Sequence, residues 1–281
     1  MAVLRLKKWN LSIGDGQPLV CIAGLNVLEN LELALETAAH LKAVTAALGM
    51  PFVFKASFDK ANRSSLSSYR GPGLAKGLEM LAAVKAKLGV PIATDIHEIA
   101  QAEPVATVAD LVQIPAFLCR QTDLVTAAAR ATAAAGGWLH VKKGQFLAPW
   151  DCRNIVAKIR EATSSEITIL CERGNSFGYN NLVVDMLGIA EMKALGVPVT
   201  IDATHAVQLP GADPRSNGAS TGGRRDGVPV IAKAAVAAGA DGVFLEFHPD
   251  PDKALCDALS CLPLDSAAAL LATLKTIRAA V

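Results

Sequence analysis

The sequence predicts an α/β fold, a (β/α)8 TIM barrel with a short N-terminal β-hairpin. Eight short apolar runs, each typical of a β-strand, alternate with Ala- and Leu-rich segments whose apolar residues recur every three or four positions. Most of the runs are apolar nearly throughout, as strands covered on both faces must be. Eight such units in about 265 residues match the size of a (β/α)8 barrel. We therefore expect one domain spanning residues 1–281.

The runs that predict strands follow one another at regular intervals. They are residues 18–24, 51–57, 91–97, 111–116, 138–143, 167–173, 198–205 and 242–248. Two of the segments that predict helices, 28–49 and 73–89, end at a glycine, which is a common helix stop signal. Ahead of the first strand, residues 1–16 alternate around a turn and predict a hairpin that covers one end of the barrel.

A doubly wound parallel sheet is the structural alternative. Such a sheet normally carries the glycine-rich turn G-x-G-x-x-G after its first strand. Here the corresponding turn reads GLNVLEN, which does not match that pattern. The barrel is therefore favoured.

Composition narrows the class of protein. The net charge of +1 provides no global field to attract nucleic acid or an anionic membrane, so any anion site must be local. We find no apolar run of 18 residues and no secretory signal at the start of the sequence. The six cysteines are scattered, which is typical of a reduced protein. We expect a cytoplasmic protein with no nucleic-acid or membrane partner.

The side chains at the ends of the predicted strands indicate where function lies, because active sites of such barrels sit there. Lysines and arginines follow the second, fourth, fifth and sixth strands, and Asp, His or Glu follows the third, seventh and eighth. A single charge at a strand end meets solvent and is unremarkable. Several cations that converge on one mouth, however, are suited to binding phosphate groups. Lys142 and Lys143 should point in opposite directions, and His140 should lie in the core.

Six motifs resemble those of the 3-deoxy-D-manno-octulosonate 8-phosphate synthases. They read FKASFDKANRSS, QIPAFLCRQTDL, VKKGQF, ERGNSFGYNNLVVDM, DATHAVQLPG and EFHPDPDKALCD, and they fall between residues 54 and 257. The resemblance as a whole runs from the first predicted strand to the last predicted helix. The resemblance implies condensation of phosphoenolpyruvate with D-arabinose 5-phosphate and water, which gives the eight-carbon keto-sugar acid phosphate and inorganic phosphate. It also implies a role in lipopolysaccharide synthesis and a homotetramer. The sister 3-deoxy-D-arabino-heptulosonate 7-phosphate synthases typically have a KPRTS-like segment where this chain has KANRSS.

The resemblance also assigns roles to residues. Phosphoenolpyruvate would be held by Lys55, Lys60, Gln113, Ala116, Arg120, Lys142 and Arg173. Asn62, Arg63 and Ser64 would serve the arabinose phosphate, with Arg63 and Ser64 reaching the site of a neighbouring subunit. Asp95, Gln145, His205, Glu246 and Asp257 would line the reacting centre. Lys60 could in addition donate a proton, provided that neighbouring cations lower its pKa.

One residue bears on the metal requirement. Part of the family binds a divalent metal through a Cys on the first strand together with a His, a Glu and an Asp. Here His205, Glu246 and Asp257 are present, but Asn26 stands at the Cys position, as in the metal-independent branch. A neutral amide is a weak ligand for zinc or iron. We therefore expect no metal and no other cofactor, with Cys256 as a lesser candidate for a substitute ligand.

Three alternatives to this function stay open on the sequence. The first is an enzyme like the heptulosonate phosphate synthases, and the second is a barrel that binds a phosphorylated sugar without catalysis. The third is a metal-dependent or Schiff-base aldolase on the same barrel. The sequence also leaves open whether the glycine-rich residues 211–227 form a lid over the substrates.

Overall fold

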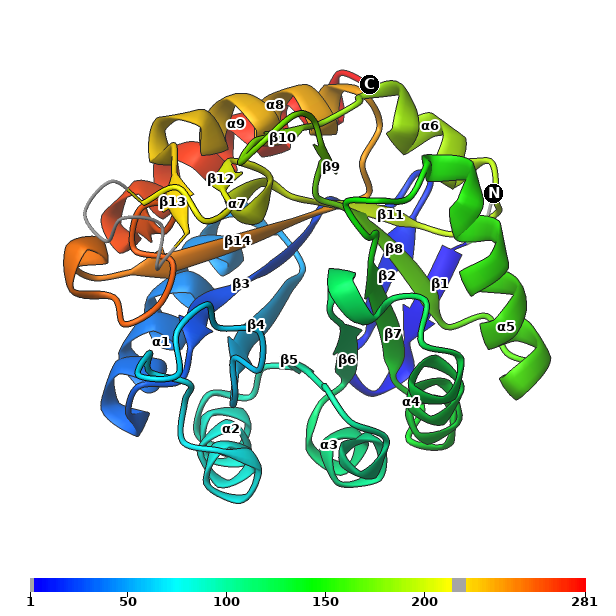
Figure 1. Cartoon of the computed structure of the whole chain (residues 1–281), viewed down its shortest axis with the longest axis horizontal. Helices are drawn as coiled ribbons and strands as arrows, with labels where there is room; N and C mark the ends of the chain where they lie inside the picture. Colours follow the sequence, from blue (N-terminus) through cyan, green and yellow to red (C-terminus); the bar gives the residue numbers. More distant parts are fainter. Residues whose placement is uncertain (1–2, 214–220) are drawn as a thin grey trace.

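Eight parallel strands close into a barrel at the centre of the molecule (Figure 1). The structure, a computed structural model, describes residues 3–213 and 221–281. The strands are β3 (Val20–Val27), β4 (Phe52–Ser57), β5 (Ile92–Asp95), β6 (Leu111–Ile114), β7 (Trp138–Lys142), β8 (Thr168–Glu172), β11 (Val199–Asp202) and β14 (Gly242–His248). Each strand pairs in parallel with the next, and β14 pairs with both β11 and β3, which closes the ring. The predicted barrel and all eight of its strands are confirmed.

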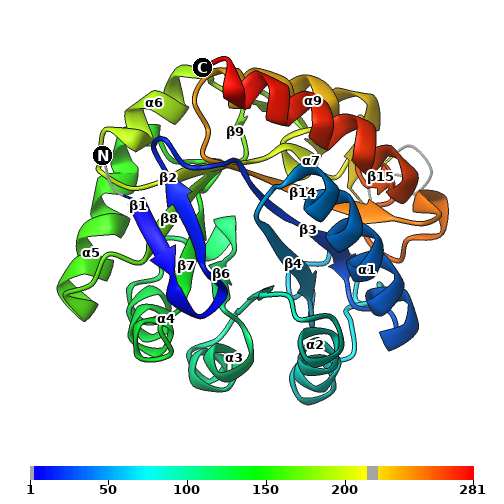
Figure 2. The same cartoon turned by 180° about the vertical axis from the view of Figure 1, so that it is seen from behind.

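A helix follows each strand and covers the outside of the barrel (Figures 1 and 2). The helices are α1 (Leu31–Leu48), α2 (Leu74–Leu88), α3 (Ala102–Val108), α4 (Thr122–Ala134), α5 (Arg153–Thr163), α6 (Leu187–Lys193), α8 (Val228–Ala237) and α9 (Ala267–Ala279). The side chain of Asn30 caps α1 by accepting a hydrogen bond from the backbone N–H of Leu33. Gly49 and Gly89 end α1 and α2 in left-handed conformations, as the sequence predicts.

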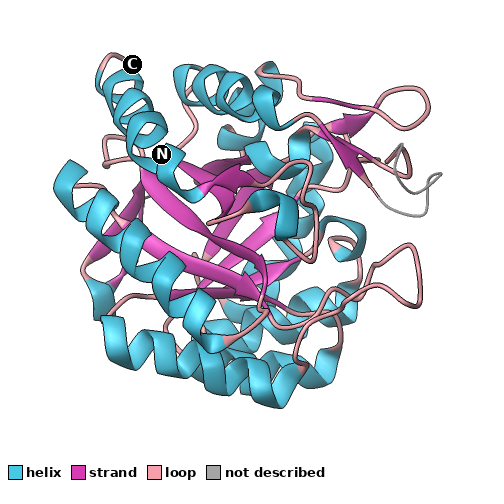
Figure 3. Ribbon diagram, turned by 90° about the vertical axis from the view of Figure 1, so that its left-hand side faces the viewer, coloured by secondary structure: helices cyan, strands magenta, loops and turns pink. Residues whose placement is uncertain are grey.

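The loops at the carboxyl ends of the strands contain short helices and strands of their own. Figure 3 shows the long loops projecting on one side of the barrel. The hairpin of β9 (Asn175–Ser176) and β10 (Leu182–Val183) follows β8. Helix α7 (Ala203–Ala206) follows β11, and β12 (Gln208–Leu209) pairs with β13 (Gly222–Gly223) beyond it. Strand β15 (Leu262–Pro263) pairs in parallel with the end of β14. Residues 214–220 of the glycine-rich segment 211–227 lie outside the described residues.

The N-terminal hairpin closes one mouth of the barrel. Strands β1 (Val3–Leu6) and β2 (Leu11–Gly14) pair in antiparallel fashion around a 3-10 turn at Lys7–Trp9. Their buried residues Leu4, Leu6 and Ile13 pack against apolar side chains from inside the barrel, including Trp138 and Phe244. A second and larger core lies between the strands and the outer helices. The hairpin therefore leaves the mouth at the carboxyl ends of the strands as the open one.

Two smaller expectations also find their place in the fold. His140 is fully buried, and all six cysteines are buried and free of disulfides. Within residues 3–213 and 221–281, no helix combines the length and the hydropathy that a membrane span requires.

The hairpin cap leads to a prediction about stability. Ile13 is completely buried, whereas Val3 on the same hairpin is 38% exposed. Replacing Ile13 by Ala should lower the free energy of unfolding by about 2–5 kcal/mol, because it removes buried methyl groups and leaves a cavity. Urea unfolding followed by circular dichroism measures the loss, with Val3→Ala as the matched control. Equal urea midpoints for the two variants would show that packing of the hairpin against the barrel does not contribute to the free energy of unfolding.

Candidate active site

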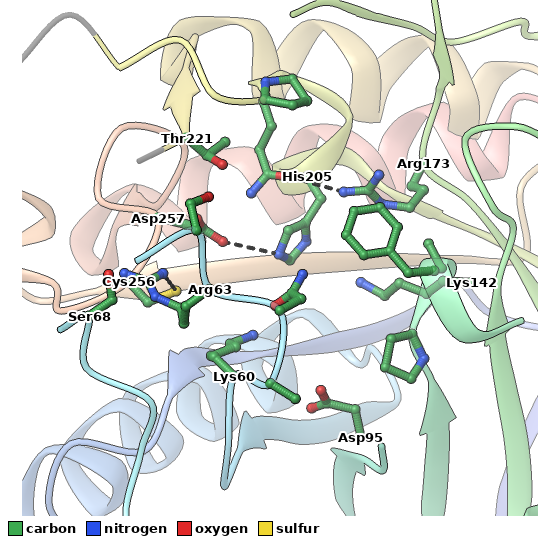
Figure 4. Close-up of a pocket in the computed structure, with 18 of the residues that line it drawn as sticks. Lys60, Arg63, Ser68, Asp95, Lys142, Arg173, His205, Thr221, Cys256 and Asp257 are labelled. Carbon is green, nitrogen blue, oxygen red and sulfur yellow. Dashed lines mark hydrogen bonds and ion pairs between the residues drawn. The ribbon is translucent and has the colours of Figure 1, made fainter. Parts of the chain in front are cut away.

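A cavity of about 590 Å³ opens at the carboxyl ends of the barrel strands (Figure 4). Its volume is in the range that small-molecule sites occupy. The residues that line the cavity include Lys55, Lys60, Asn62, Arg63, Ser64, Asp95, Gln113, Ala116, Lys142, Gln145, Arg173, His205 and Asp257. All of these were candidates from the sequence. The remaining candidates, Asn26, Glu246 and Arg120, do not line it.

The floor of the cavity is built on a buried ion pair. Lys55 Nζ on β4 lies 2.7 Å from Glu246 Oε1 on β14, and both side chains are almost completely buried. The backbone oxygen of Asn26 accepts a second hydrogen bond from Lys55, at 3.0 Å. Burial lowers the pKa of Lys55 and Glu246 opposes the change. Burial also raises the pKa of Glu246, but His205 and Lys55 outweigh it and hold that pKa below its ordinary value.

A second buried pair orients the site histidine. Lys142 on β7 donates to Asp202 on β11, and its Nζ lies 3.4 Å from the ring centroid of Phe244. Asp202 also accepts from the backbone N–H of His205 at 2.9 Å and lies 2.7 Å from its Nδ1. Burial lowers the pKa of His205, but Asp202 and Glu246 outweigh it and raise that pKa above 6.5. With Nδ1 bound to Asp202, the ring directs Nε2 toward Glu246 and Asp257.

Lys60 is held as a cation, which corrects the idea that it donates a proton through a lowered pKa. Its side chain is 9% exposed at the cavity wall. Burial lowers the pKa of Lys60, but the nearby carboxylates of Glu246 and Asp95 outweigh burial and raise it above its ordinary value. The sequence suggested neighbouring cations, whereas the fold surrounds the ammonium with carboxylates from β14 and β5. Lys60 is therefore a fixed positive charge.

Asp95 is fixed from two sides at the end of β5. Ser57 on β4 donates to one carboxylate oxygen, and His97 Nε2 lies 3.0 Å from the other. Burial raises the pKa of Asp95, but the hydrogen bond from His97 and the charge of Lys60 lower it well below 3.8. His97 itself lines the cavity and was not among the candidate residues. Its spacing of two from Asp95 was the signal, because alternate residues share one face of an extended chain.

Arg173, directly after β8, has a hydrogen-bond donor without a partner among the described residues. Its Nη2 donates to Gln208 Oε1 at 3.0 Å, while Nη1 is buried and has no hydrogen-bond partner among the described residues. Gln145 Oε1 is likewise buried and unpaired within that part of the chain. Unpaired buried polar atoms on a cavity wall are typical of a site that a polar ligand completes. Gln208 was missed from the sequence because nothing in its motif distinguishes it as a partner of Arg173.

The loop after β4 carries Asn62, Arg63 and Ser64 to the opposite side of the cavity. Arg63 Nη1 donates to Cys256 Sγ at 2.6 Å (Figure 4). Burial and Asp257 raise the pKa of the Cys256 thiol, so the group is neutral. Arg120 lines a separate cleft beside the cavity, and the two share His97, Glu98 and Leu118 along their border. Within one chain, Arg120 is therefore not brought together with the other candidates.

One group of side chains has the composition of a metal site. His205, Glu246 and Asp257 place a ligand atom each within 4.8 Å of one another. His205 Nε2 lies 3.5 Å from Glu246 and 3.6 Å from Asp257. Asp257 reaches this position with a left-handed backbone, φ 50°, which Asp tolerates better than most residues. Cys256 is not part of the group, because its sulfur is bound by Arg63.

Asn26 lies beside His205, Glu246 and Asp257, at the position where metal-binding relatives have a Cys ligand, and its side chain acts there as a hydrogen-bond donor. Strand β3 changes register between Gly24 and Val27, and Asn26 lies in this irregular stretch. A Cβ atom on Gly24 would come within 2.0 Å of the Lys55 backbone oxygen, so only glycine allows the approach of β4. Asn26 Nδ2 donates to Glu246 Oε2 and to Asp257 Oδ2, the latter at 3.0 Å. The amide thus offers N–H groups, and no lone pair, to the two carboxylates.

Comparison with known proteins shows one consistent family. The model of the DAHP synthetase I family matches residues 2–281. The chain is 53% identical over 272 residues to the 2-dehydro-3-deoxyphosphooctonate aldolase of Geobacter metallireducens, covering 97% of both chains. It is 51% identical over 277 residues to the protein of that name from Cupriavidus necator, covering 97% of this chain and 93% of the relative. The one from Nitratidesulfovibrio vulgaris is 56% identical over 256 residues, 91% of this chain and 90% of the relative.

Proposed function

This chain belongs to the DAHP synthetase I family, and we propose that it is a 3-deoxy-D-manno-octulosonate 8-phosphate synthase, the enzyme also called 2-dehydro-3-deoxyphosphooctonate aldolase. It condenses phosphoenolpyruvate with D-arabinose 5-phosphate and water to give 3-deoxy-D-manno-octulosonate 8-phosphate and phosphate. The product serves lipopolysaccharide biosynthesis in the cytoplasm. The observation that carries the proposal is the cavity itself, whose lysines and arginines come from three different strands, β4, β7 and β8, or the loops that follow them.

The first substrate fits the most buried wall of the cavity. Lys55, Lys60, Lys142 and Arg173 all line it. The carboxylate and phosphate of phosphoenolpyruvate require fixed positive charges, and the unpaired Nη1 of Arg173 is available for one of them. Gln113 and the backbone of Ala116 complete this side of the site. Glu246 and Asp202 hold Lys55 and Lys142, and Gln208 holds Arg173, so these cations need not reorganise when the substrate arrives.

The reaction joins carbon 3 of phosphoenolpyruvate to the aldehyde carbon of the sugar while water adds at carbon 2. The bond between carbon 2 and the phosphate oxygen then breaks and releases phosphate. Negative charge develops on the aldehyde oxygen and on the leaving phosphate, and fixed cations stabilise both. Lys60 acts through its charge. Holding the two substrates face to face makes the step nearly unimolecular, worth up to ~7–11 kcal/mol.

The second substrate fits the loop after β4. Asn62, Arg63 and Ser64 line the cavity directly after Lys60, in the segment that reads KANRSS. This segment favours the five-carbon sugar phosphate over the four-carbon substrate of the heptulosonate phosphate synthases. Asp95, Gln145, His205 and Asp257 lie between the two ends of the cavity and surround the reacting atoms.

The orientation of Asn26 supports a mechanism that needs no metal. A metal at His205, Glu246 and Asp257 would compete with the Asn26 amide hydrogens, which already satisfy both carboxylates. In this orientation Nδ2 faces the two carboxylates, so the lone pairs of Asn26 Oδ1 are not directed at an ion between them. The residues present therefore do not fit a tightly held divalent ion. His205 and Asp257, which line the cavity, act as substrate ligands, and the buried Glu246 is a counter-charge for Lys55 and Lys60.

Exposed aromatic side chains support a homotetramer. Phe117, Phe146, Trp150, Phe177 and Tyr179 lie on loops that follow strands β6, β7 and β8, and Phe177 and Tyr179 are 72% and 99% exposed. Large apolar exposure of this kind is typical of an interaction surface. Assembly of these loops against a second copy would also bring Arg120 of one subunit toward the site of another, whereas Arg63 and Ser64 line the cavity of their own chain, which corrects the expectation that they reach a neighbouring site.

The choice of sugar tests the function directly. Purified protein with phosphoenolpyruvate should release phosphate rapidly with arabinose 5-phosphate and slowly with erythrose 4-phosphate, because KANRSS suits the longer sugar. A reaction without sugar controls for simple phosphatase activity. Equal turnover with the two sugars would remove the proposed specificity, and no release with either would indicate a barrel that only binds.

The phosphoenolpyruvate clamp is tested by Lys142→Ala and Arg173→Ala. Each should lower kcat/KM more than tenfold, because a charge-assisted hydrogen bond contributes about 1.5–3 kcal/mol. Arg153→Ala, an exposed cation on α5, is the matched control and should keep wild-type kinetics. Circular dichroism establishes that each variant is folded. Near wild-type kinetics in a folded variant would place that residue outside the site.

The metal prediction concerns Asn26. The wild-type enzyme should keep its activity after prolonged chelation, since no step depends on an ion. Asn26→Cys adds a thiolate beside His205, Glu246 and Asp257 and should raise the zinc or iron content measured by mass spectrometry. Asn26→Ala removes the same amide without adding a ligand and should not. Loss of wild-type activity in chelator, with recovery on adding manganese, zinc or iron, would overturn this assignment.

The assembly is tested by light scattering. The protein should have about four times the chain mass of 29.2 kDa. Tyr179→Asp should shift the distribution toward smaller species, because it places a charge in an apolar contact. Val3→Asp, a similar change on the hairpin at the other end of the barrel, should leave the mass unchanged. A wild-type monomer at micromolar concentration would contradict the proposal.

A further inference from the structure

A row of three polar side chains crosses the barrel interior beside the cavity. His140 on β7 is fully buried and does not line the cavity. Its Nδ1 lies 3.2 Å from Gln113 Oε1 on β6, and its Nε2 lies 2.8 Å from Thr200 Oγ1 on β11. The ring stacks on Phe244, with centroids 6.1 Å apart and planes 18° from parallel. Gln113 is the one member of the row that reaches the cavity.

The protonation of His140 follows from its surroundings. Burial, and then the charge of Lys142, lower the pKa of His140 to about 3, and Asp202 offsets this only in part. At neutral pH the ring therefore carries one N–H and one lone pair. The Gln113 Oε1 atom is a carbonyl oxygen that can only accept. The contact between them requires the proton on Nδ1, and Nε2 then accepts from the Thr200 hydroxyl.

The opposite arrangement has a definite consequence at the cavity. With the proton on Nε2, the ring would donate to Thr200, whose hydroxyl would turn to the backbone oxygen of Leu170, 3.3 Å away. Nδ1 would then be an acceptor, so the Gln113 amide would have to rotate and present its NH2 group to the ring. Its carbonyl oxygen would face the cavity. The two arrangements thus differ in which end of the Gln113 amide a ligand meets.

We propose that His140 is a positioning residue, whose Nδ1–H group holds the Gln113 carbonyl so that the Gln113 NH2 group faces the cavity as a hydrogen-bond donor to phosphoenolpyruvate. The proposal rests on the proposed function, since the negative charge of that substrate is what makes a donor favourable there. A carbonyl oxygen in the same place would repel a carboxylate or phosphate. The arrangement leaves the Gln113 amide in its observed orientation, with its carbonyl oxygen toward the ring.

Hydrogen positions test the proposal without any substrate. Neutron diffraction from a deuterated crystal of the full chain should show deuterium on His140 Nδ1 and none on Nε2. The Gln113 ND2 group should be directed into the cavity. Deuterium on Nε2, or on both ring nitrogens, would overturn the proposal. Because this measurement involves no turnover, it stands even if the enzyme proves to catalyse another reaction.

Kinetics test the path through Gln113. His140→Leu should raise KM for phosphoenolpyruvate about tenfold with a smaller change in kcat, because the donor is no longer fixed. In a Gln113→Ala background the same change should have less than about a twofold effect on KM, since its target is gone. His140→Asn, whose amide can donate from a place near Nδ1, should restore most of the affinity.

A structural control separates positioning from loss of packing. Thr200→Val breaks the other end of the row but leaves the Nδ1–H contact to Gln113, so KM for phosphoenolpyruvate should stay within about twofold of wild type even if the melting temperature falls. An undiminished effect of His140→Leu in the Gln113→Ala background would overturn the proposal. So would a failure of His140→Asn to recover affinity in a folded protein.

Discussion

The site depends on the pairing of charges that the closed barrel removes from water. Lys55 on β4 and Lys142 on β7 extend into an interior where an isolated ammonium group would be strongly destabilised. Glu246 and Asp202 lie beside them, each on a strand far away in the sequence. Removing one partner of such a pair leaves a buried charge without compensation. Neither member of the pairs Lys55–Glu246 and Lys142–Asp202 can therefore be replaced without the other. The positions of these pairs determine the shape of the cavity above them.

The same pairing sets the protonation states of the site. Burial alone would favour neutral acids and neutral amines, but the opposite charges outweigh it at Asp95, Asp202, Glu246 and Asp257, whose pKa values are all lowered. Lys60 and His205 shift in the complementary direction. The site consequently consists of fixed charges and oriented dipoles. A condensation in which charge moves from one substrate to another is well served by such preorganisation.

Neutral polar side chains hydrogen-bond to the charged residues at positions where a further charge would change the net charge of the cavity. The Asn26 amide links Glu246 and Asp257 by hydrogen bonds, and Gln208 holds one side of the Arg173 guanidinium. Neutral His140 performs a similar task for Gln113 one layer away. Each of these groups orients a neighbour without adding to the net charge of the cavity. The hairpin β1–β2 supports the whole arrangement by filling the opposite mouth with apolar side chains.

The sequence by itself determined the barrel, its eight strands, the hairpin and most of the charged side chains that line the cavity. It could do so because parallel strands all present their carboxyl ends to one mouth, so a residue such as Arg173 or Asp257 is placed by its position after a strand. Only the tertiary structure decided which groups meet. Lys142 and Asp202 lie 60 residues apart, and Asn26 and Asp257 lie 231 apart. No periodicity encodes such pairs. Electrostatic interactions depend on burial and on separation in space, not on order along the chain. Only the tertiary structure could therefore decide the direction of the Lys60 pKa shift, the hydrogen bond from Arg63 to Cys256 and the position of Arg120 outside the cavity.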